Sequence, residues 1–191
     1  MRKIFFDIET SNAFQDVGSR DPSALDLSVI AIYDSKIGEY SSYLQDELSK
    51  LWPILENADM LIGFYSNKFD IPLLDKYYPG NLTEIRHLDL LAEIKKSLGR
   101  NVALDKLTQG TLNSSKSGHG LQATNWWKQG KTDEVRKYCI QDVKVTKGIY
   151  DYAIKHGRLK FKEDGKIQEF NIDASKWEKG DKSSITHTLP F

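Results

Sequence analysis

Apolar residues gather in short runs over the first ninety residues of the chain, and polar segments separate these runs. The runs are rich in β-branched and aromatic residues, which is typical of strands. Strands are predicted at residues 4–9, 27–33, 39–44, 60–64 and 85–90. Between the first two strands, residues 10–26 are polar and rich in turn formers, so a long loop is expected there.

Apolar residues at helical spacing fill most of the remaining chain. Asn67 is placed to cap a helix that has Pro72 in its first turn and ends at 78–80. A long helix is expected to begin at a Thr132 cap and to stop at Gly157. Further helical segments are predicted at 46–57, from the fifth strand to about 98, within 99–120, and at 121–127. Strands followed by alternating helices indicate a mixed α/β sheet domain.

The last part of the chain has a different pattern. Two strand-like stretches, 158–161 and 166–172, flank Glu163-Asp164-Gly165, which predicts a β-hairpin. Beyond Asp173 the chain is polar and is expected to be loosely held. We therefore predict one domain over residues 1–155, followed by a hairpin and tail over 156–191.

Composition limits the class of protein. The 191 residues suit one compact domain, and 39% hydrophobic residues suffice for a core. No apolar run approaches the roughly 20 residues of a membrane span, and Asp7 interrupts the N-terminal apolar stretch, so no signal peptide is expected. A single cysteine, Cys139, excludes an internal disulfide. A cytoplasmic protein is expected.

The charges balance overall but not along the chain. Residues 1–110 carry 12 basic and 17 acidic side chains, whereas residues 111–191 carry 15 basic and 10 acidic ones. An acidic front half and a basic back half suit a protein that holds a metal with one part and a polyanion with the other. Chance explains an imbalance of this size equally well.

Two carboxylates interrupt the first predicted strand at Asp7 and Glu9. Side chains two residues apart share a face of a strand, so both acids are expected to point the same way, with Ile8 opposite. Carboxylates held side by side repel each other, and a bound divalent cation relieves that cost. For this motif alone, a strand that ends here with both acids in water explains the pair at least as well.

A third carboxylate, Asp70, lies among apolar residues in the first turn of the helix predicted after the fourth strand. An acid at this place could face a metal. It could equally be there because the helix dipole stabilises a negative charge in the first turn.

The fourth carboxylate is Asp142, on the long predicted helix. At 100° per residue, Asp142 falls within the inward stripe of that helix, where burying a lone carboxylate is costly. Tyr138 lies one turn earlier on the same face. A tyrosine–aspartate hydrogen bond at the edge of the core is possible, but a metal-facing acid is the favoured interpretation. The stripe is formed by Val135, Tyr138, Asp142, Thr146, Ile149 and Ala153.

Together, the three motifs resemble those of the DEDD superfamily of 3′–5′ exonucleases, which are DnaQ-like and have a ribonuclease H-like fold. The tyrosine at 138 indicates the tyrosine subtype, since the histidine subtype would have His where this chain has Lys137. The stretch 104–142 is similar to stand-alone exonucleases related to the proofreading domain of family B DNA polymerases, and to predicted exonucleases of the YprB type. The resemblance covers residues 1–155. Its motifs are Phe6-Asp7-Ile8-Glu9-Thr10, Asn67-Lys68-Phe69-Asp70 and Tyr138-Cys139-Ile140-Gln141-Asp142.

The resemblance implies a mixed β-sheet flanked by helices, with the hairpin as an appendage, and two divalent cations, Mg²⁺ or Mn²⁺. Asp7 would be shared by both ions, Glu9 and Asp142 would complete one site, and Asp70 would support the second through water. Tyr138 would orient the attacking water, because a phenol with a pKa near 10 is a poor general base. The implied reaction hydrolyses a terminal phosphodiester and releases nucleoside 5′-monophosphates.

Five residues are expected to contact nucleic acid. Phe64 could stack on a terminal base or belong to the core, and the polar loop 113–120 could grip a phosphate or be solvated. Basic residues near the hairpin could trail a single strand or form a solvated face. The predicted nucleic-acid contacts are Thr10, Phe64, Asn67, Lys116 and His119, and the hairpin lysines are Lys155, Lys160, Lys162 and Lys166.

We therefore predict a metal-dependent 3′–5′ exonuclease that acts on single-stranded ends, with DNA as the favoured substrate. An exoribonuclease is an alternative, because sequence does not reveal contacts to a 2′-OH. A non-catalytic nucleic-acid-binding module is another, but it would be expected to lose carboxylates that are all present here. A helicase or polymerase partner could deliver the end.

Overall fold

A mixed five-stranded sheet forms the centre of the computed structural model, which describes residues 1–114 and 120–179. Its strands are β1 Lys3–Thr10, β2 Leu27–Asp34, β3 Glu39–Leu44, β4 Met60–Gly63 and β5 His87–Asp89. Their order across the sheet is β3-β2-β1-β4-β5. β1 pairs antiparallel with β2 and parallel with β4, so it lies in the middle of the sheet.

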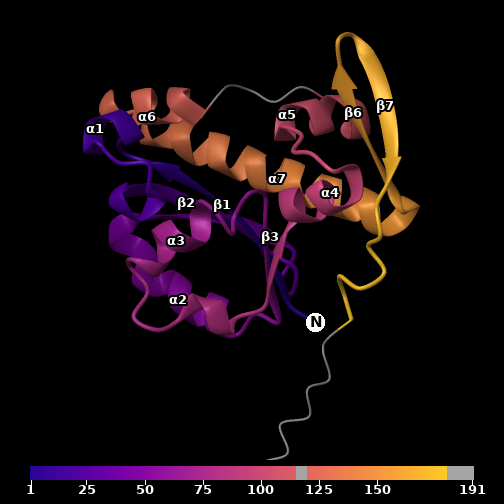
Figure 1. The fold of residues 1–191 in the computed structure, drawn as a ribbon. Helices are drawn as coiled ribbons and strands as arrows, with labels where there is room; N and C mark the ends of the chain where they lie inside the picture. The colour runs from indigo at the N-terminus through magenta and orange to yellow at the C-terminus, as the bar shows by residue number, and fades with distance from the viewer. Residues whose placement is uncertain (115–119, 180–191) are drawn as a thin grey trace, which may run out of the picture.

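Helices cover both faces of the sheet, which gives three layers (Figure 1). One face is covered by α2 Leu48–Glu56 and α3 Asp70–Asp75, and the other by α4 Leu90–Leu98, α5 Leu104–Leu107, α6 Gly120–Lys128 and α7 Thr132–His156. Shorter helical turns are α1 Phe14–Val17, η1 Pro22–Ala24, η2 Gln45–Glu47, η3 Leu82–Glu84 and the π-helix η4 Thr108–Leu112. Among the described residues, no helix combines the length and apolar character needed to cross a membrane.

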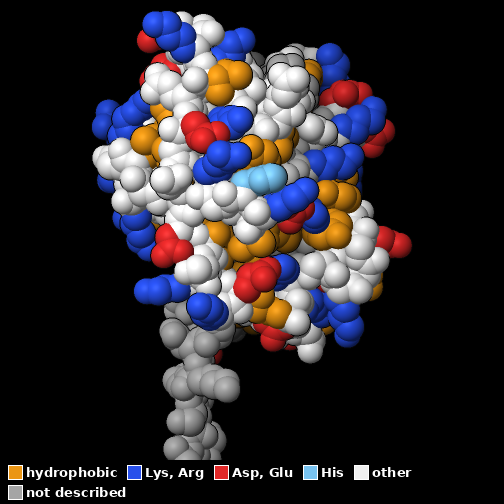
Figure 2. All heavy atoms as spheres, turned by 90° about the vertical axis from the view of Figure 1, so that its right-hand side faces the viewer, with side chains coloured by type: hydrophobic (Ala, Val, Ile, Leu, Met, Phe, Trp, Pro, Cys, Tyr) orange, Lys and Arg blue, Asp and Glu red, His pale blue; other side chains and the backbone are white. Residues whose placement is uncertain are grey.

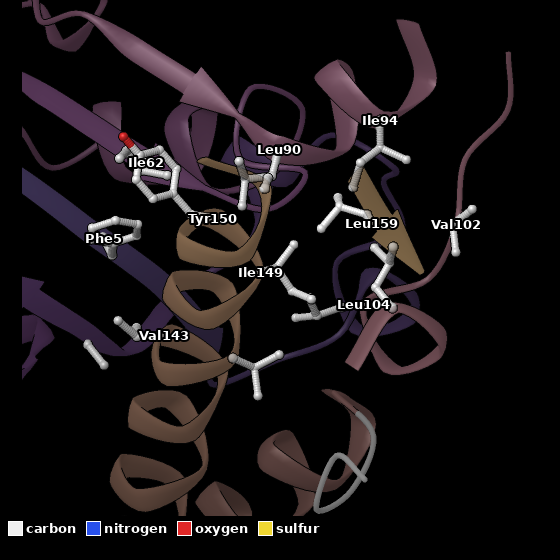
Figure 3. Close-up of a cluster of buried hydrophobic side chains, with 14 of the residues drawn as sticks. Phe5, Ile62, Leu90, Ile94, Val102, Leu104, Val143, Ile149, Tyr150 and Leu159 are labelled. Carbon is white, nitrogen blue, oxygen red and sulfur yellow. The ribbon is translucent and has the colours of Figure 1, made fainter. Parts of the chain in front are cut away.

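Side chains of β1 alternate between two buried clusters, as the strand pleat requires. Phe5 packs in the cluster beneath α7, together with Val143 and Ile149 (Figure 3). The even-numbered residues from Ile4 to Ile8 pack in the opposite cluster, with α2 and α3. Odd-numbered residues farther along β1 therefore point towards the α7 side.

The structure confirms the five predicted strands and the long helix, with boundaries that differ by one or two residues at some ends. Two helix caps were predicted wrongly. α3 begins at Asp70 with Phe69 as its cap residue, and Asn67 lies in a preceding turn in which the Lys68 and Phe69 N–H groups donate to the Tyr65 carbonyl oxygen. Thr132 is the first residue of α7, and Lys131 precedes it as the cap. The predicted loop at 10–26 contains α1 and η1.

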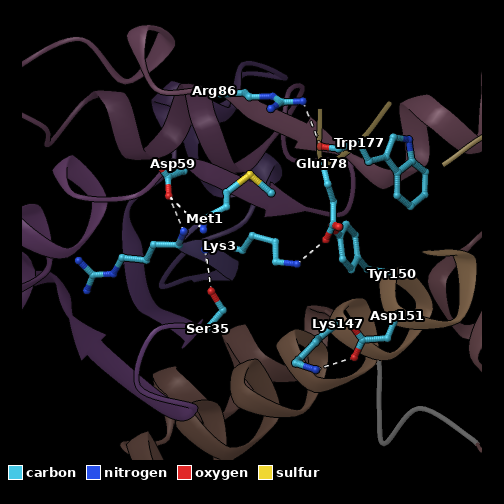
Figure 4. Close-up of polar contacts among 11 residues, drawn as sticks. Met1, Lys3, Ser35, Asp59, Arg86, Lys147, Tyr150, Asp151, Trp177 and Glu178 are labelled. Atoms are coloured by element: carbon cyan, nitrogen blue, oxygen red, sulfur yellow. Dashed lines mark hydrogen bonds and ion pairs between the residues drawn. The ribbon is translucent and has the colours of Figure 1, made fainter. Parts of the chain in front are cut away.

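The prediction that the chain is loosely held beyond Asp173 is wrong for residues 174–179, and the rest of it lies outside the described residues. Trp177 is buried and stacks on Tyr150 of α7, with ring centroids 5.6 Å apart. The Glu178 carboxylate accepts hydrogen bonds from the Tyr150 hydroxyl (2.9 Å) and the Lys3 ammonium (2.5 Å) (Figure 4). Trp177 thus anchors an otherwise polar segment to α7, and Glu178 links it to the start of β1.

The predicted hairpin is confirmed as β6 Arg158–Glu163 and β7 Lys166–Asn171. Arg158 and Lys160 both pair with Glu169, at 3.2 and 3.5 Å. On the face of the molecule that includes the right-hand side of Figure 1, basic side chains alternate with acidic ones (Figure 2). Lys160, one of the hairpin lysines, is therefore paired with an acidic residue of the hairpin itself.

Candidate active site

Asp7 and Glu9 occupy the odd-numbered positions of β1 and so face α7. In the antiparallel register, Asp7 lies opposite Ala31 and Glu9 opposite Val29 of β2. The small side chain of Ala31 leaves room beside Asp7 for residues of α7. The prediction that the two acids share a face of the strand is confirmed.

Asp142 of α7 meets these two acids. One carboxylate oxygen from each of Asp7, Glu9 and Asp142 lies within 4.8 Å of the other two. Glu9 and Asp142 are buried, at 8% and 3% exposure, so solvent screens their repulsion poorly. Three carboxylate oxygens this close form the donor set that Mg²⁺ or Mn²⁺ prefers. The residues thus fit a divalent cation.

Asp70, the acid of the second motif, approaches from the other side of β1. β4 pairs with β1 only as far as Ile62 opposite Phe5. Beyond that point, the Asp70 carboxylate takes the place of a neighbouring strand and accepts the backbone N–H of Ile8 at 3.0 Å. Burial raises the pKa of Asp70 to about 7, and nearby carboxylates add to this rise. Asp70 lies outside the group of three oxygens.

A tight loop between β4 and α3 carries Asp70 to this place. A Cβ on Gly63 would lie 2.5 Å from the Cβ of Ser66, so only glycine lets the loop turn this closely. Tyr65 has a φ of +64°, a left-handed conformation that costs a non-glycine residue energy. Other contacts must therefore stabilise this loop conformation.

The loop between β4 and α3 is held by Asp89, a residue that the sequence analysis missed. Its carboxylate is buried and accepts the backbone N–H groups of Tyr65 (2.9 Å) and Asn67 (3.2 Å). It also caps α4 by accepting the N–H groups of Leu91 (2.9 Å) and Ala92 (3.3 Å). The sequence did contain a signal for this role: Asp89 directly precedes an apolar helical segment, which is the pattern of a helix N-cap.

Cys139 lies behind the acidic group and was also missed as a site residue. Its thiol donates to the carbonyl oxygen of Asp7 at 3.1 Å, and its sulfur lies 3.6 Å from the Asp7 carboxylate. Burial, together with the carboxylates around it, raises the pKa of this thiol well above its usual range. Cys139 therefore stays protonated and supports Asp7.

Tyr138 precedes Asp142 by one turn of α7 and is buried. It lines the same cavity as the acids, which agrees with the predicted inward stripe. The ring of Trp126, from α6, meets the Tyr138 ring edge-on, with centroids 6.0 Å apart. This contact restricts the position of the tyrosine ring beside the acidic group.

The acids line a cavity of about 530 Å³ whose lining also includes apolar and aromatic side chains. This volume lies within the usual range for small-molecule sites. Of the predicted nucleic-acid contacts, Thr10 and Phe64 line the cavity, Asn67 does not, and Lys116 and His119 lie outside the described residues. The polar and acidic lining comprises Asp7, Glu9, Thr10, Asn12, Gln15, Asp70, Thr124, Tyr138 and Asp142, and the apolar and aromatic lining Ile8, Ala13, Phe14, Leu25, Phe64, Tyr65 and Phe69.

Comparison with known protein families agrees with this architecture. The RNase H superfamily matches residues 4–154, and the chain therefore belongs to that superfamily. The predicted fold class is confirmed: an RNase H-like mixed sheet flanked by helices, followed by the β6–β7 hairpin. A comparison with curated proteins finds no match.

Among solved structures, the chain is similar to the family B DNA polymerase from the hyperthermophilic archaeon Pyrobaculum calidifontis. The TM-score is 0.62 and the sequence identity is 17%. The match covers 81% of this chain but 24% of the polymerase chain, so this chain spans about a quarter of the polymerase. At this identity, the similarity shows a shared fold.

Proposed function

We propose that this protein is a metal-dependent 3′–5′ exonuclease that removes nucleoside 5′-monophosphates from single-stranded ends, with DNA favoured over RNA. The observation that carries the proposal is the group of three carboxylate oxygens within 4.8 Å of one another. This group lines a cavity that also has apolar and aromatic side chains in its lining. Such a cavity suits a terminal nucleotide, with its phosphate at the acids and its base on the apolar side chains. The resemblance of the three motifs to DEDD exonucleases supports the choice of reaction.

In this mechanism Asp7, Glu9 and Asp142 would hold the divalent cations, with Asp70 supporting a second ion. When bound, the cations supply a nucleophilic water and stabilise charge on the leaving oxygen. The residues of the chain itself position the reacting water and exclude bulk solvent. The Tyr138 hydroxyl orients the attacking water, and the rings of Phe64 and Phe14 in the cavity lining exclude solvent from the bound nucleotide.

Degradation of 5′-labelled single strands tests the proposal. DNA and RNA of one sequence are incubated with the protein and either Mg²⁺ or Mn²⁺. The expected result is a ladder that shortens from the 3′ end, faster for DNA. Asp142→Asn should abolish it, whereas Asp151→Asn, an exposed aspartate on the same helix paired with Lys147, should not.

Faster degradation of RNA than of DNA would contradict the proposed preference for DNA and would indicate an exoribonuclease. No metal-dependent cleavage of either strand would refute the free-standing enzyme. The assay is then repeated with a helicase or polymerase present, because such a partner could deliver the end. Continued inactivity would leave a non-catalytic binding module.

A further inference from the structure

A second hollow of about 310 Å³ adjoins the acidic cavity at Tyr138, which lines both. Its other lining residues are Trp126 of α6 and Glu134, Lys137 and Gln141 of α7. The α7 residues of the hollow follow the spacing i, i+3, i+4, i+7, so they form one stripe along the helix. The hollow thus lies between α6 and α7, directly beside the acidic cavity.

The lining of this hollow combines an aromatic face with a cation. Trp126 is half-buried, and its edge-on contact with Tyr138 restricts the orientation of its ring. The Lys137 side chain is 71% exposed and has an exposed pairing with Glu134 at 3.1 Å. A surface ion pair of this kind is weak, so a phosphate can compete for the lysine. Aromatic faces with nearby cations are how proteins bind single-stranded nucleic acid without reading its sequence.

The second hollow lies where the substrate strand would leave the acidic cavity. In the proposed function, the terminal nucleotide fills the acidic cavity and the scissile phosphate lies at the carboxylates. The strand must then leave past the residues that border this cavity, and Tyr138 is the residue shared with the second hollow. The hairpin begins after residue 156, about 20 Å along α7 from Asp142. It therefore lies too far away to contact the next nucleotide.

We propose that this second hollow binds the penultimate nucleotide of the strand, with its base stacked on Trp126 and its 5′ phosphate paired with Lys137. The inference rests on the proposed function. Gln141 follows Lys137 by about one turn of α7 and directly precedes Asp142, so its amide can hydrogen-bond a sugar or base edge in the hollow. The enzyme then recognises two nucleotides at the 3′ end and tolerates any penultimate base, because every base has a face to stack.

Removing the penultimate base directly tests whether that base stacks on Trp126. Release of the first nucleotide is measured below saturation on two 5′-labelled DNA strands, one normal and one with an abasic residue at the penultimate position. In the wild type, the abasic residue should lower kcat/KM at least about five-fold, the lower end for one stacked base. Trp126→Ala should show a similar loss on the normal strand and no further loss on the abasic strand. Trp126→Phe should restore the difference between the two strands.

Lysine substitutions provide the matched comparison. Lys137→Gln should raise KM several-fold and leave kcat unchanged. Lys131→Gln makes the same charge change at an exposed site just before α7, and it should behave as the wild type. An equal loss in both lysine variants would mean a general electrostatic effect and would refute the Lys137 contact.

Two results would overturn the Trp126 assignment. If the wild type cleaves both strands equally fast, no penultimate base is bound. If Trp126→Ala loses the same factor on both strands, Trp126 acts only by packing against Tyr138.

Equilibrium binding of the same two strands, followed by fluorescence anisotropy in Ca²⁺, separates this inference from the proposed function. Base-dependent binding that Trp126→Ala removes would support the second hollow even if no strand were cleaved. In that case only the exonuclease proposal would fail. Binding that depends on neither the base nor Trp126 would refute the second hollow, whatever the cleavage assay shows.

Discussion

The Asp70 carboxylate accepts the backbone N–H of Ile8 at 3.0 Å, between the two acids of β1. This bond joins the first residue of α3 to the central strand where β4 no longer pairs with it. It fixes the second motif against the first although 62 residues separate them in sequence. Because Asp70 is buried beside other carboxylates, the same arrangement makes its charged form costly.

Asp70 should therefore make the metal-free protein less stable as the pH rises from about 4 to about 7. Its pKa is 3.8 when unperturbed and about 7 in the folded protein. Within this interval the folded state holds a proton that the unfolded state has lost, so the free energy of unfolding falls as pH rises. The loss is at most about 4 kcal/mol. Urea unfolding in EDTA at pH 5 and pH 7.5 should show about 2–3 kcal/mol of this loss, because about two of the roughly three pH units lie between these values.

Asp70→Asn should remove most of this pH dependence, because an amide does not titrate in this range. The amide oxygen can still accept the Ile8 N–H. Asp75→Asn, at the exposed end of the same helix, is the control and should keep the wild-type slope. An Asp70→Asn variant with an unchanged slope would show that other groups cause the pH dependence.

Asp89→Ala should destabilise the protein by at least about 2 kcal/mol, because it removes a helix cap and leaves buried N–H groups without an acceptor. The loop that carries Asp70 should loosen with it, since Tyr65 and Asn67 lose their acceptor. Faster hydrogen exchange at these two amides would measure that loosening. Asp21→Ala removes an exposed cap elsewhere and should leave both amides unchanged. Unchanged exchange in Asp89→Ala would contradict the positioning role.

Local sequence patterns were sufficient to predict the strands, and to predict which face of its own strand or helix each acid occupies. Asp7 and Glu9 share a strand face because the period of a strand is two residues, and Asp142 falls on the inward stripe of α7 because a helix turns 100° per residue. Both relationships need only neighbouring residues. The structure bears them out.

Relationships between distant segments were harder to predict. The cap at Asn67 failed because the turn before α3, which the Asp89 carboxylate holds from the end of β5, places Asn67 three residues ahead of the helix. Trp177 is isolated in a polar segment, so no periodicity indicated that it would stack on Tyr150. The role of Cys139 depends on its contact with Asp7, which lies 132 residues away. Contacts of this kind follow from tertiary packing and leave no local pattern.

Gly110→Ala should destabilise the protein by about 1–3 kcal/mol or more, because a methyl group there would lie 2.5 Å from the backbone of Phe161 in β6. Gly148→Ala is the matched control. Its methyl group would meet only the end of the Leu112 side chain, which can move, and alanine favours the α7 helix by about 1 kcal/mol. Urea unfolding should show a loss for Gly110→Ala and none for Gly148→Ala. Equal effects would mean that η4 does not pack rigidly on the hairpin.

Divalent cations should stabilise the folded protein through the three acids. At about 100 times the dissociation constant, a bound ion adds about 2.7 kcal/mol, which raises the Tm of a chain this size by about 5–10 °C. Asp142→Asn should lose most of this shift in Mn²⁺, while its metal-free form is at least as stable as the wild type. Asp151→Asn should keep the shift. An undiminished shift in Asp142→Asn would place the ion elsewhere.

Tyr138→Phe should lower kcat about 100-fold, the usual cost of a misplaced reacting group, without weakening metal binding. The phenyl ring keeps the edge-on contact with Trp126, so only the hydroxyl that would orient water is lost. The Mn²⁺-induced rise in Tm should therefore match the wild type. Tyr152→Phe, a half-buried tyrosine farther along α7, should leave kcat unchanged. If Tyr138→Phe abolished the Mn²⁺ shift, the hydroxyl would be part of the metal site, and if kcat were unchanged, it would have no part in the reaction.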